Sequence, residues 1–182
     1  MKFRQTEIQG LIVVEPTVFR DERGFFMETY HQKKFAEAGI PGPFVQTNHA
    51  RSIKNTLRGL HFQSPNPQGK LVRCLSGEIF DVAVDIRNGS PTLGKWFGLI
   101  LSGENKLQLY VPPDFAHGYC ILSDFAEATY ACTDLYAPKQ EGGIIWNDPV
   151  LAISWPISEP ILSPKDTHFP GWTDFCRSHG TR

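Results

Sequence analysis

The sequence predicts an all-β domain, and three observations lead to that prediction. The chain contains 14 prolines and 16 glycines, and few of its segments repeat apolar residues at helical spacing. Short apolar runs are separated by turn residues at close intervals. Residues 79–86 alternate strictly, with Phe80, Val82 and Val84 on one face and Asp81 and Asp85 on the other. Such strands form a sandwich or a barrel, and we favour a jelly roll over an immunoglobulin-type sandwich.

Length, charge and cysteine content narrow the class of protein. The 182 residues, 41% of them hydrophobic, predict a single domain over 1–182 with short N- and C-terminal extensions. A net charge of -1 argues against a nucleic-acid partner. No apolar run is long enough to cross a membrane, and the N-terminus lacks the apolar core of a signal peptide. The four cysteines form no CxxC pair, and three lie in strand-like segments, which predicts buried thiols in a cytoplasmic protein.

The first third of the chain predicts two strands, a helix and a further strand. Residues 8–19 form a first strand broken at Pro16, and residues 19–30 form a charged turn that leads into the second strand. Residues 31–38 are the best helix candidate, because Gly39 and Pro41 follow as stop signals. Residues 44–49 alternate again, which places Gln46 and Asn48 on the same face.

The centre of the chain predicts a polar site between buried strands. Residues 57–63 and 68–72 are apolar runs separated by a turn at 64–67. His61 lies near the end of the first run, Lys70 lies near the start of the second, and Arg58 precedes His61 by three residues. Two cations beside a histidine in one pocket need an anion to offset their desolvation. We therefore predict a functional site at this turn.

The second half of the chain predicts further strands followed by irregular structure. Strands are expected at 79–86, 96–101 and 107–111, and a loop at 112–119 ends in His117 beside Gly118. Residues 126–136 form another predicted strand, with Tyr130 and Tyr136 on one face and about 20 Å apart. From residue 138 onward the pattern is irregular, although the aromatic residues of the tail predict that part of it packs against the barrel.

The polar candidates favour acid–base chemistry over other mechanisms. Gln63 occupies the place of the second histidine in a His-x-His metal motif, which leaves too few protein ligands for a typical site. No nucleophile elbow and no Gly-x-Gly-x-x-Gly motif is present. A histidine such as His61 can remove a proton beside a carbonyl, Lys70 can stabilise the enolate, and Tyr130 can return a proton to the opposite face. That set of groups supports epimerisation without a cofactor.

Several motifs, in order along residues 3–166, closely resemble the dTDP-4-dehydrorhamnose 3,5-epimerase family. They are Phe19-x-Asp21-x-Arg23-Gly24-x-Phe26-x-Glu28-x-Tyr30, Gln46-x-Asn48, Leu57-Arg58-Gly59-Leu60-His61-Phe62-Gln63, Gln68-x-Lys70-Leu71-Val72, Gly77-x-x-x-Asp81-Val82, Ser90-Pro91-Thr92-x-Gly94-x-Trp96, Ala116-His117-Gly118 and Trp146-Asn147-Asp148-Pro149. The resemblance implies a cupin-type jelly-roll homodimer with short peripheral helices. It implies no metal or cofactor, and conversion of dTDP-4-dehydro-6-deoxy-D-glucose to dTDP-4-dehydro-L-rhamnose.

The resemblance also implies a role for each matching residue. His61 is the expected proton acceptor, Tyr130 the proton donor, Asp166 the carboxylate that orients His61, and Lys70 the group that stabilises the enolate at C4. Arg23 and Arg58 are expected to contact the diphosphate, and Tyr136 is expected to stack on thymine. Some of the contacts are expected from the partner subunit. The expected substrate-binding residues are Arg23, Glu28, Gln46, Thr47, Asn48, Arg58, Lys70, His117, Tyr136, Glu141 and Lys165.

Three alternatives remain at this stage. The chain could be a 3-epimerase or ketoisomerase on a related dTDP-4-keto-6-deoxy sugar, a cupin that binds a nucleotide sugar without chemistry, or a metal-dependent cupin enzyme.

The strand pattern conflicts with the family assignment at Arg58 and His61. In a straight strand these two residues lie on opposite faces, so placing both in one site requires a bulge or bend near Gly59.

Overall fold

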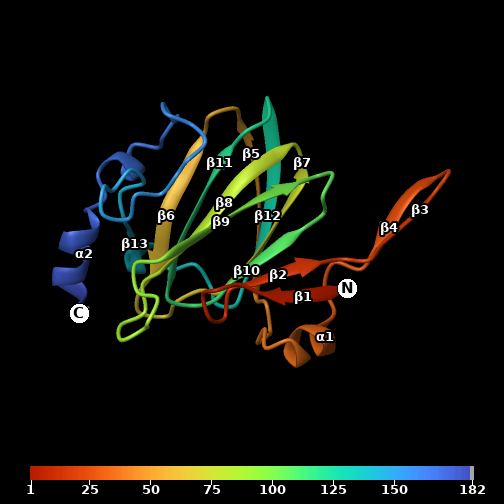
Figure 1. Ribbon diagram of the computed structural model, residues 1–182, viewed down its shortest axis with the longest axis horizontal. Coiled ribbons are helices and arrows are strands. Elements are labelled where there is room, and N and C mark those ends of the chain that lie inside the picture. Colours follow the sequence, from red (N-terminus) through yellow and green to blue (C-terminus); the bar gives the residue numbers. More distant parts are fainter. Residues whose placement is uncertain (181–182) are drawn as a thin grey trace.

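The computed structural model describes residues 1–180, which fold into two antiparallel sheets that face each other (Figure 1). The first sheet has the strand order β1-β2-β10-β7-β12-β5, and the second has the order β13-β6-β11-β8-β9. This arrangement is the predicted jelly-roll barrel. The strands of the first sheet are β1 (Lys2–Gln5), β2 (Ile12–Glu15), β10 (Gln108–Val111), β7 (Lys70–Ser76), β12 (Phe125–Cys132) and β5 (Gln46–Ile53). Those of the second are β13 (Glu141–Gly143), β6 (Leu57–Gln63), β11 (Phe115–Ile121), β8 (Glu78–Asp85) and β9 (Trp96–Ser102).

A separate hairpin and short helices lie outside the two sheets. Strands β3 (Val18–Asp21) and β4 (Gly24–Met27) pair only with each other, and their hairpin projects away from the barrel (Figure 1). The predicted helix at 31–38 is confirmed as α1 (Gln32–Glu37). The other helices are η1 (Pro138–Gln140), η2 (Lys165–Thr167) and α2 (Trp172–His179). None of the helices within residues 1–180 is long and apolar enough to cross a membrane.

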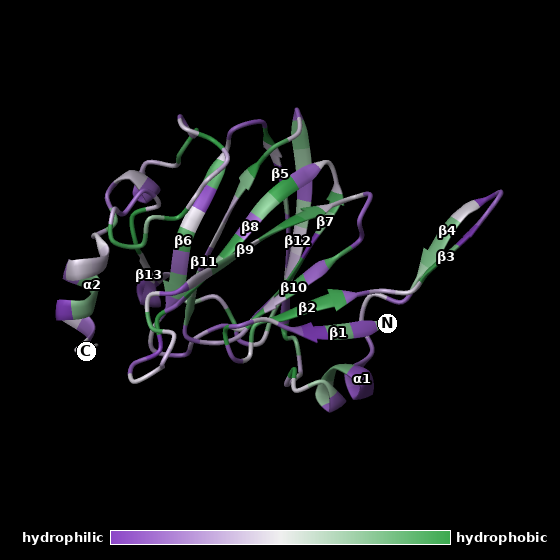
Figure 2. Cartoon of the chain, viewed as in Figure 1, coloured by the Kyte–Doolittle hydropathy of each residue, from purple (hydrophilic) through white to green (hydrophobic). Residues whose placement is uncertain are grey.

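The alternation predicted for residues 79–86 is confirmed by β8, whose two faces contribute to two different cores. Ile79 and Ala83 pack with residues of both sheets in the barrel interior. Val82 and Val84 face the other way and pack under the C-terminal segment, against Phe175 of α2. The isoleucine and valine side chains each contribute roughly 1.5–3 kcal/mol when they leave water. The hydrophobic colouring concentrates on the central strands, and the polar colouring on the turns and peripheral helices (Figure 2).

Two sequence expectations about strands are wrong. The predicted loop at 112–119 is in fact largely strand β11, and all seven of its residues are buried. One face of β11 packs in the barrel interior and the other under the C-terminal segment, so the strand shows none of the alternation that marks a half-buried strand. The predicted strand at 126–136 ends at Cys132. Tyr136 therefore lies in the turn beyond β12, where its backbone N–H donates to the side chain of Gln46 (2.8 Å).

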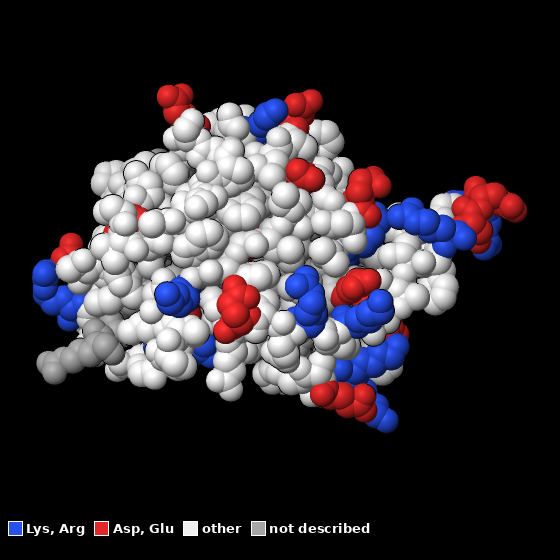
Figure 3. All heavy atoms as spheres, viewed as in Figure 1, with Lys and Arg blue, Asp and Glu red and all other residues white. Residues whose placement is uncertain are grey.

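Charged residues are unevenly distributed over the face shown in Figure 3. Lysines, arginines and acidic residues gather around the projecting hairpin and α1, whereas much of the barrel surface in this view is uncharged. The hairpin combines this charge with exposed aromatic side chains, because Phe19, Phe25 and Phe26 are 62%, 51% and 72% exposed. The hairpin thus presents a mixed charged and aromatic surface that remains largely exposed, although the ammonium group of Lys106 lies 4.1 Å from the centre of the Phe25 ring.

Candidate active site

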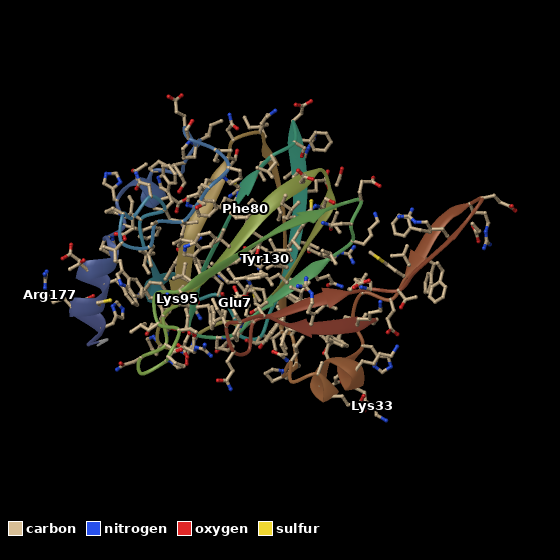
Figure 4. The ribbon with its side chains drawn as sticks, viewed as in Figure 1. Glu7, Lys33, Phe80, Lys95, Tyr130 and Arg177 are labelled. Carbon is tan, nitrogen blue, oxygen red and sulfur yellow. The ribbon has the colours of Figure 1, made fainter. Side chains whose placement is uncertain are left out.

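A cavity of about 330 Å³ opens between the two sheets, which is large enough for a small ligand. Residues from both sheets, from the turn after β12 and from η2 form its wall. Figure 4 shows Tyr130 within the barrel, whereas Lys33 and Arg177 lie on helices at the periphery. The lining residues are Gln46, Asn48, Ala50, Arg58, His61, Phe62, Gln63, Gln68, Lys70, His117, Tyr119, Tyr130, Tyr136, Glu141, Ser163, Lys165 and Asp166.

His61 is held in this cavity by a short contact with Asp166. The imidazole projects from β6, and η2 brings the Asp166 Oδ1 atom to 2.6 Å from His61 Nε2. Burial alone would raise the pKa of Asp166, but the hydrogen bond and charge of His61, together with smaller contributions from Ser163 and Lys165, outweigh it, so the pKa lies below the ordinary value. Since an ionised carboxylate can only accept hydrogen bonds, Nε2 has the hydrogen and Nδ1 is left free to accept one. The pair therefore has the geometry of an oriented base.

The conflict between Arg58 and His61 is resolved by an irregularity at Gly59. The register between β6 and β11 shifts between the pairs His61–His117 and Arg58–Tyr119. Gly59 has φ +120°, and a Cβ atom there would lie 2.7 Å from backbone atoms of β11. Only glycine allows the two strands to approach this closely at that backbone angle. As a result, both Arg58 and His61 line the cavity, and Arg58 is oriented by hydrogen bonds to Ser52 Oγ (3.0 and 3.1 Å).

Tyr130 reaches the same cavity from the opposite sheet. It lies on β12, between β5 and β7, and its ring packs against the residues of the barrel interior. Burial raises the pKa of the Tyr130 phenol, with a smaller contribution from Cys132. The phenol therefore remains protonated at neutral pH and is suited to donate a proton rather than to remove one.

Lys70 places an ammonium group in the cavity without a counterion. It is the first residue of β7, and its Nζ atom has no hydrogen-bond or ion-pair partner among the residues that the structure describes. Burial lowers the pKa of Lys70, although the nearby Cys132, Asp81 and Glu141 oppose that shift. An unpaired, partly desolvated cation of this kind is stabilised when negative charge develops in front of it.

A second histidine, His117, faces the cavity beside His61. The two residues are directly opposite each other on the neighbouring strands β11 and β6. His117 Nε2 lies 3.0 Å from both carboxylate oxygens of Asp81, which is fully buried on β8. The cavity therefore contains two imidazole–carboxylate pairs, one at its edge and one built into the centre of a sheet.

The polar rim of the cavity is cross-linked by hydrogen bonds. Tyr136 donates its hydroxyl hydrogen to Glu141 (2.9 Å), and Lys165 forms an ion pair with the other oxygen of Glu141 (2.7 Å). Gln46 and Asn48 lie on the same face of β5, as their spacing predicted, and bond to each other (3.1 Å). These contacts hold one aromatic ring and several hydrogen-bonding groups around the mouth of the cavity.

Three of the predicted binding residues are not brought to this cavity within one chain. Arg23 lies at the tip of the β3–β4 hairpin, is 85% exposed and pairs with Asp21 (2.6 Å). Glu28 follows β4 and pairs with Lys34 of α1 (2.6 Å). Thr47 is exposed on the opposite face of β5 from Gln46 and Asn48. The structure therefore separates Arg23, Glu28 and Thr47 from the other predicted contacts.

Sequence reasoning missed several residues of the cavity wall. Tyr119 was assigned to the wrongly predicted loop, and it could be recognised only once β11 was known to be a strand. Gln63 and Gln68 were noted as motif residues without a role. Gln63 bonds to the backbone of Leu135 and Ala137, and Gln68 bonds to that of Asp134, so both anchor the turn that presents Tyr136. The other missed residues are Ala50, Phe62 and Ser163.

The metal-ligating residues of the described chain are dispersed. Within residues 1–180, no group of three or more histidine, cysteine, aspartate or glutamate side chains is arranged to hold a metal ion. Cys74, Cys120 and Cys132 are buried thiols, as the sequence predicted, and within the described chain the cysteines form no disulfide. The polar part of the cavity wall includes imidazole, phenol, ammonium, guanidinium, carboxamide and carboxylate groups.

Comparison with known proteins identifies close relatives over nearly the whole chain. A family model described as dTDP-4-dehydrorhamnose 3,5-epimerase matches residues 5–174. The enzyme of that name from Shigella flexneri is 54% identical, over 96% of this chain and 97% of its own length. A crystal structure of dTDP-4-dehydrorhamnose 3,5-epimerase from Elizabethkingia anophelis NUHP1 has a TM-score of 0.92 at 48% identity, covering 96% of this chain and 97% of that one.

A liganded structure and a more distant relative complete the comparison. The structure of dTDP-6-deoxy-D-glucose-3,5-epimerase from Legionella pneumophila Philadelphia 1, in complex with dTDP-4-keto-L-rhamnose, has a TM-score of 0.91 at 52% identity. It covers 93% of this chain and 92% of that one. The dTDP-4-dehydrorhamnose 3-epimerase of Streptomyces niveus is 40% identical, over 91% of this chain and 81% of its own length.

Proposed function

The chain belongs to the dTDP-4-dehydrorhamnose 3,5-epimerase family, and on this premise we propose how its site acts. The reaction is the conversion of dTDP-4-dehydro-6-deoxy-D-glucose to dTDP-4-dehydro-L-rhamnose by inversion at C3 and C5. Both carbons flank the C4 ketone, so the hydrogen on each is acidified by the same carbonyl group. The chain is an isomerase, and the relatives that share about half of its residues have the name of the double epimerase.

One observation supports this proposal above all others. His61 and Tyr130 project from opposite sheets into a single cavity, with the unpaired ammonium of Lys70 in the same space. Inversion requires a base on one face of the sugar and an acid on the other. A cavity walled by a histidine from β6 and a tyrosine from β12 meets that requirement.

The first half of each inversion removes a proton. The C–H bond at C3 or C5 breaks, its hydrogen passes to His61 Nδ1, and its electron pair forms the enolate of C4. Asp166, bonded to Nε2, stabilises the imidazolium that results. Lys70 faces the negative charge that develops on the C4 oxygen, and this charge is stabilised more strongly in a partly desolvated site than in water.

The second half returns a proton to the opposite face. Tyr130 donates its phenolic hydrogen to the carbon as the enolate collapses, and the configuration inverts. His61 then holds one proton more and Tyr130 one proton fewer than at the start, so solvent must restore both groups. Hydrogen from solvent should therefore appear at each inverted carbon.

The rim residues suit the nucleotide part of the substrate. Tyr136 supplies an exposed ring for stacking on thymine. Gln46 and Asn48 supply amides for its polar edge. Arg58 is oriented by Ser52 toward the cavity, and its guanidinium suits a diphosphate oxygen. Glu141 and Lys165 form the adjoining part of the rim.

The remaining predicted contacts lead to a homodimer proposal. Arg23 and Glu28 are absent from the cavity wall and lie on or beside a hairpin that projects from the barrel with exposed aromatic residues. We propose that a second copy of the chain covers this hairpin, so that Arg23 and Glu28 reach the site of the partner chain. Thr47 is proposed to lie at the same interface between the two copies.

Mixed dimers test this proposal. Arg23→Ala and His61→Ala variants, each impaired alone, should form a hybrid dimer with one intact site and measurable activity. A monomeric protein, or hybrids without restored activity, would refute it.

The buried free thiols suit a reducing compartment, and we place the protein in the cytoplasm.

Solvent exchange tests the proposed reaction directly. Incubation with the 4-keto nucleotide sugar in deuterated water should introduce deuterium at both C3 and C5, read by NMR. Deuterium at C3 alone would assign the chain to the 3-epimerase group, which is the activity in the name of the Streptomyces niveus relative. Tight binding of the nucleotide sugar with no exchange at either carbon would leave only a binding function.

A further inference from the structure

Asp81 is a buried acidic residue that the reaction described above does not use. It lies on β8 with no exposed surface, and it is not part of the cavity wall. Both of its carboxylate oxygens lie 3.0 Å from His117 Nε2. An aspartate is rarely buried without a partner, and here the only side-chain partner within residues 1–180 is the imidazole of His117.

The other ring nitrogen of His117 faces the cavity. Nδ1 has no hydrogen-bond partner among the described residues. It is also not among the buried unpaired side-chain atoms of the described chain, which are Arg73 Nε and the Tyr110 hydroxyl oxygen. Nδ1 therefore keeps accessible surface, although His117 as a whole is only 5% exposed. Because Asp81 covers the Nε2 edge and the cavity is the open space that His117 borders, Nδ1 points into the cavity.

Building on the proposed function, we propose that Asp81 is a positioning residue that makes His117 Nδ1 a hydrogen-bond acceptor for a sugar hydroxyl. The Asp81 carboxylate accepts the Nε2–H, which fixes both the ring orientation and the tautomer. Nδ1 then presents a lone pair to the substrate. His117 lies directly opposite His61 on the neighbouring strand, so the bound hydroxyl lies beside the carbon from which His61 takes a proton, at C2 or C3 of the hexose.

The position of Asp81 explains why the second pair differs from the first. His61 must gain and lose a proton, and its carboxylate holds it through one oxygen on the separate segment η2. His117 is held through both oxygens of a residue in the adjacent strand. Asp81 also counteracts part of the burial that lowers the pKa of Lys70. The buried carboxylate thus supports two groups of the cavity wall without touching the substrate.

An isosteric substitution tests the proposed role. Asp81→Asn retains the shape, but its amide N–H₂ can donate to Nε2, which turns the ring to the tautomer with hydrogen on Nδ1. We expect kcat/KM to fall about 10- to 100-fold, whereas the affinity for dTDP alone stays within about twofold. Asp85→Asn is the matched control, because Asp85 is equally buried on the same strand but bonds to Arg87, Ser90 and Thr92 instead of an imidazole. The control should lose stability and keep its kcat/KM.

Two further measurements separate this proposal from a purely structural role. Imidazole ¹⁵N NMR of the wild-type protein should show His117 Nδ1 without hydrogen, and Asp81→Asn should move that hydrogen onto Nδ1. Substrate analogues that lack the C2 or the C3 hydroxyl should lose affinity for the wild type. For one of these two analogues, the loss of affinity should be absent in the Asp81→Asn variant. In a double-mutant cycle, that result would show that Asp81 and the missing hydroxyl are energetically coupled.

The proposal fails if Nδ1 has hydrogen in the wild type, or if neither hydroxyl is coupled to Asp81. It also fails if Asp81→Asn and Asp85→Asn lower kcat/KM equally. The NMR measurement needs no turnover, and deuterium exchange by the wild type tests the reaction itself. A failure of the proposed function can therefore be distinguished from a failure of this assignment.

Discussion

The two imidazole–carboxylate pairs of the cavity use the same chemistry in different settings. His61 is 23% exposed and meets Asp166 through one contact of 2.6 Å. The side chain of His117 is only 6% exposed and meets Asp81 through two contacts of 3.0 Å. Asp166 comes from a short helical turn about a hundred residues away, whereas Asp81 belongs to a strand hydrogen-bonded to that of His117.

This difference separates a group that reacts from a group that binds. A base must contact the substrate and exchange its proton with solvent, so it needs an open position. A binding group gains from rigidity, because a fixed acceptor loses little entropy when it meets a hydroxyl. The residue types alone are identical in the two pairs, and only their surroundings assign the roles.

The largest expected effect distinguishes the two histidines. His61→Ala removes the base, and kcat should fall roughly 10²–10⁴-fold or more. His117→Ala should act mainly on KM, because it removes a contact rather than the proton acceptor. Steady-state kinetics on both variants make the comparison, with dTDP binding as the control for folding. Equal losses of kcat in the two variants would contradict the assignment of His61 as the base and His117 as a binding residue.

Substitution of the carboxylate at the open pair should have the next largest effect. Asp166→Asn can donate to His61 Nε2, which leaves hydrogen on Nδ1 and blocks the base. We expect kcat to fall on the order of 10²–10³-fold, with KM nearly unchanged, whereas Asp81→Asn should change substrate affinity. If Asp166→Asn instead raised KM with kcat intact, Asp166 would be a binding residue.

Substitution of Tyr130 tests whether proton removal by His61 and proton return by Tyr130 are separate steps. Tyr130→Phe retains the ring and removes the donor, so inverted product should form roughly 10²-fold more slowly. Proton removal by His61 does not need the phenol, so exchange of hydrogen at C3 in deuterated water should exceed inversion in this variant. NMR of a single sample measures both rates. Loss of exchange and inversion in equal proportion would contradict the division between His61 and Tyr130.

A stability measurement sharpens the contrast between Asp81 and Asp85, the two buried carboxylates of β8. Burial alone would raise the pKa of Asp85, but hydrogen bonds from Arg87, Ser90 and Thr92 lower it from the ordinary 3.8 to about 2. A carboxylate whose pKa is lowered by folding stabilises the folded state at any pH above its ordinary pKa. That stability is lost as the pH falls from the ordinary pKa through the pKa of the folded state. Asp85→Asn should therefore cost about 2 kcal/mol at pH 7.

The pH dependence provides the check on that prediction. Denaturant unfolding of the wild type and of Asp85→Asn should give free energies that converge between about pH 4 and pH 2. A constant difference over that range would show that packing, rather than the charge of Asp85, is responsible.

The smallest expected effect concerns the phenol that neighbours His117. Tyr119 lines the cavity, and burial strongly raises the pKa of its hydroxyl group. It cannot supply a phenolate at neutral pH, and it lies on the same sheet as His61 rather than opposite it. Tyr119→Phe should therefore keep kcat within about threefold. A loss comparable with that of Tyr130→Phe would mean that Tyr119 is the proton donor.

Much of this arrangement could be predicted from the sequence, because it depends on local chemistry. The alternation of residues 79–86 placed Ile79 and Val82 on opposite faces, and the turn at 64–67 separated the strands of His61 and Lys70. The spacing of Gln46 and Asn48 placed both amides on one face of a strand. Motif order indicated the family, and with it the expected His61, Tyr130 and Asp166. In each case the signal lies within a few residues of the group concerned.

Tertiary structure alone decided which groups meet. The strand of Tyr119 is hidden in the sequence because a strand buried on both faces has no alternation, and the partnership of Asp81 with His117 joins residues 36 positions apart. The irregularity at Gly59 turned Arg58 and His61 to the same side, while Arg23, Glu28 and Thr47 stayed away from the cavity of their own chain. A sequence specifies which side chains are available and the faces they occupy. Which of them become neighbours depends on the register and packing of strands that lie far apart along the chain.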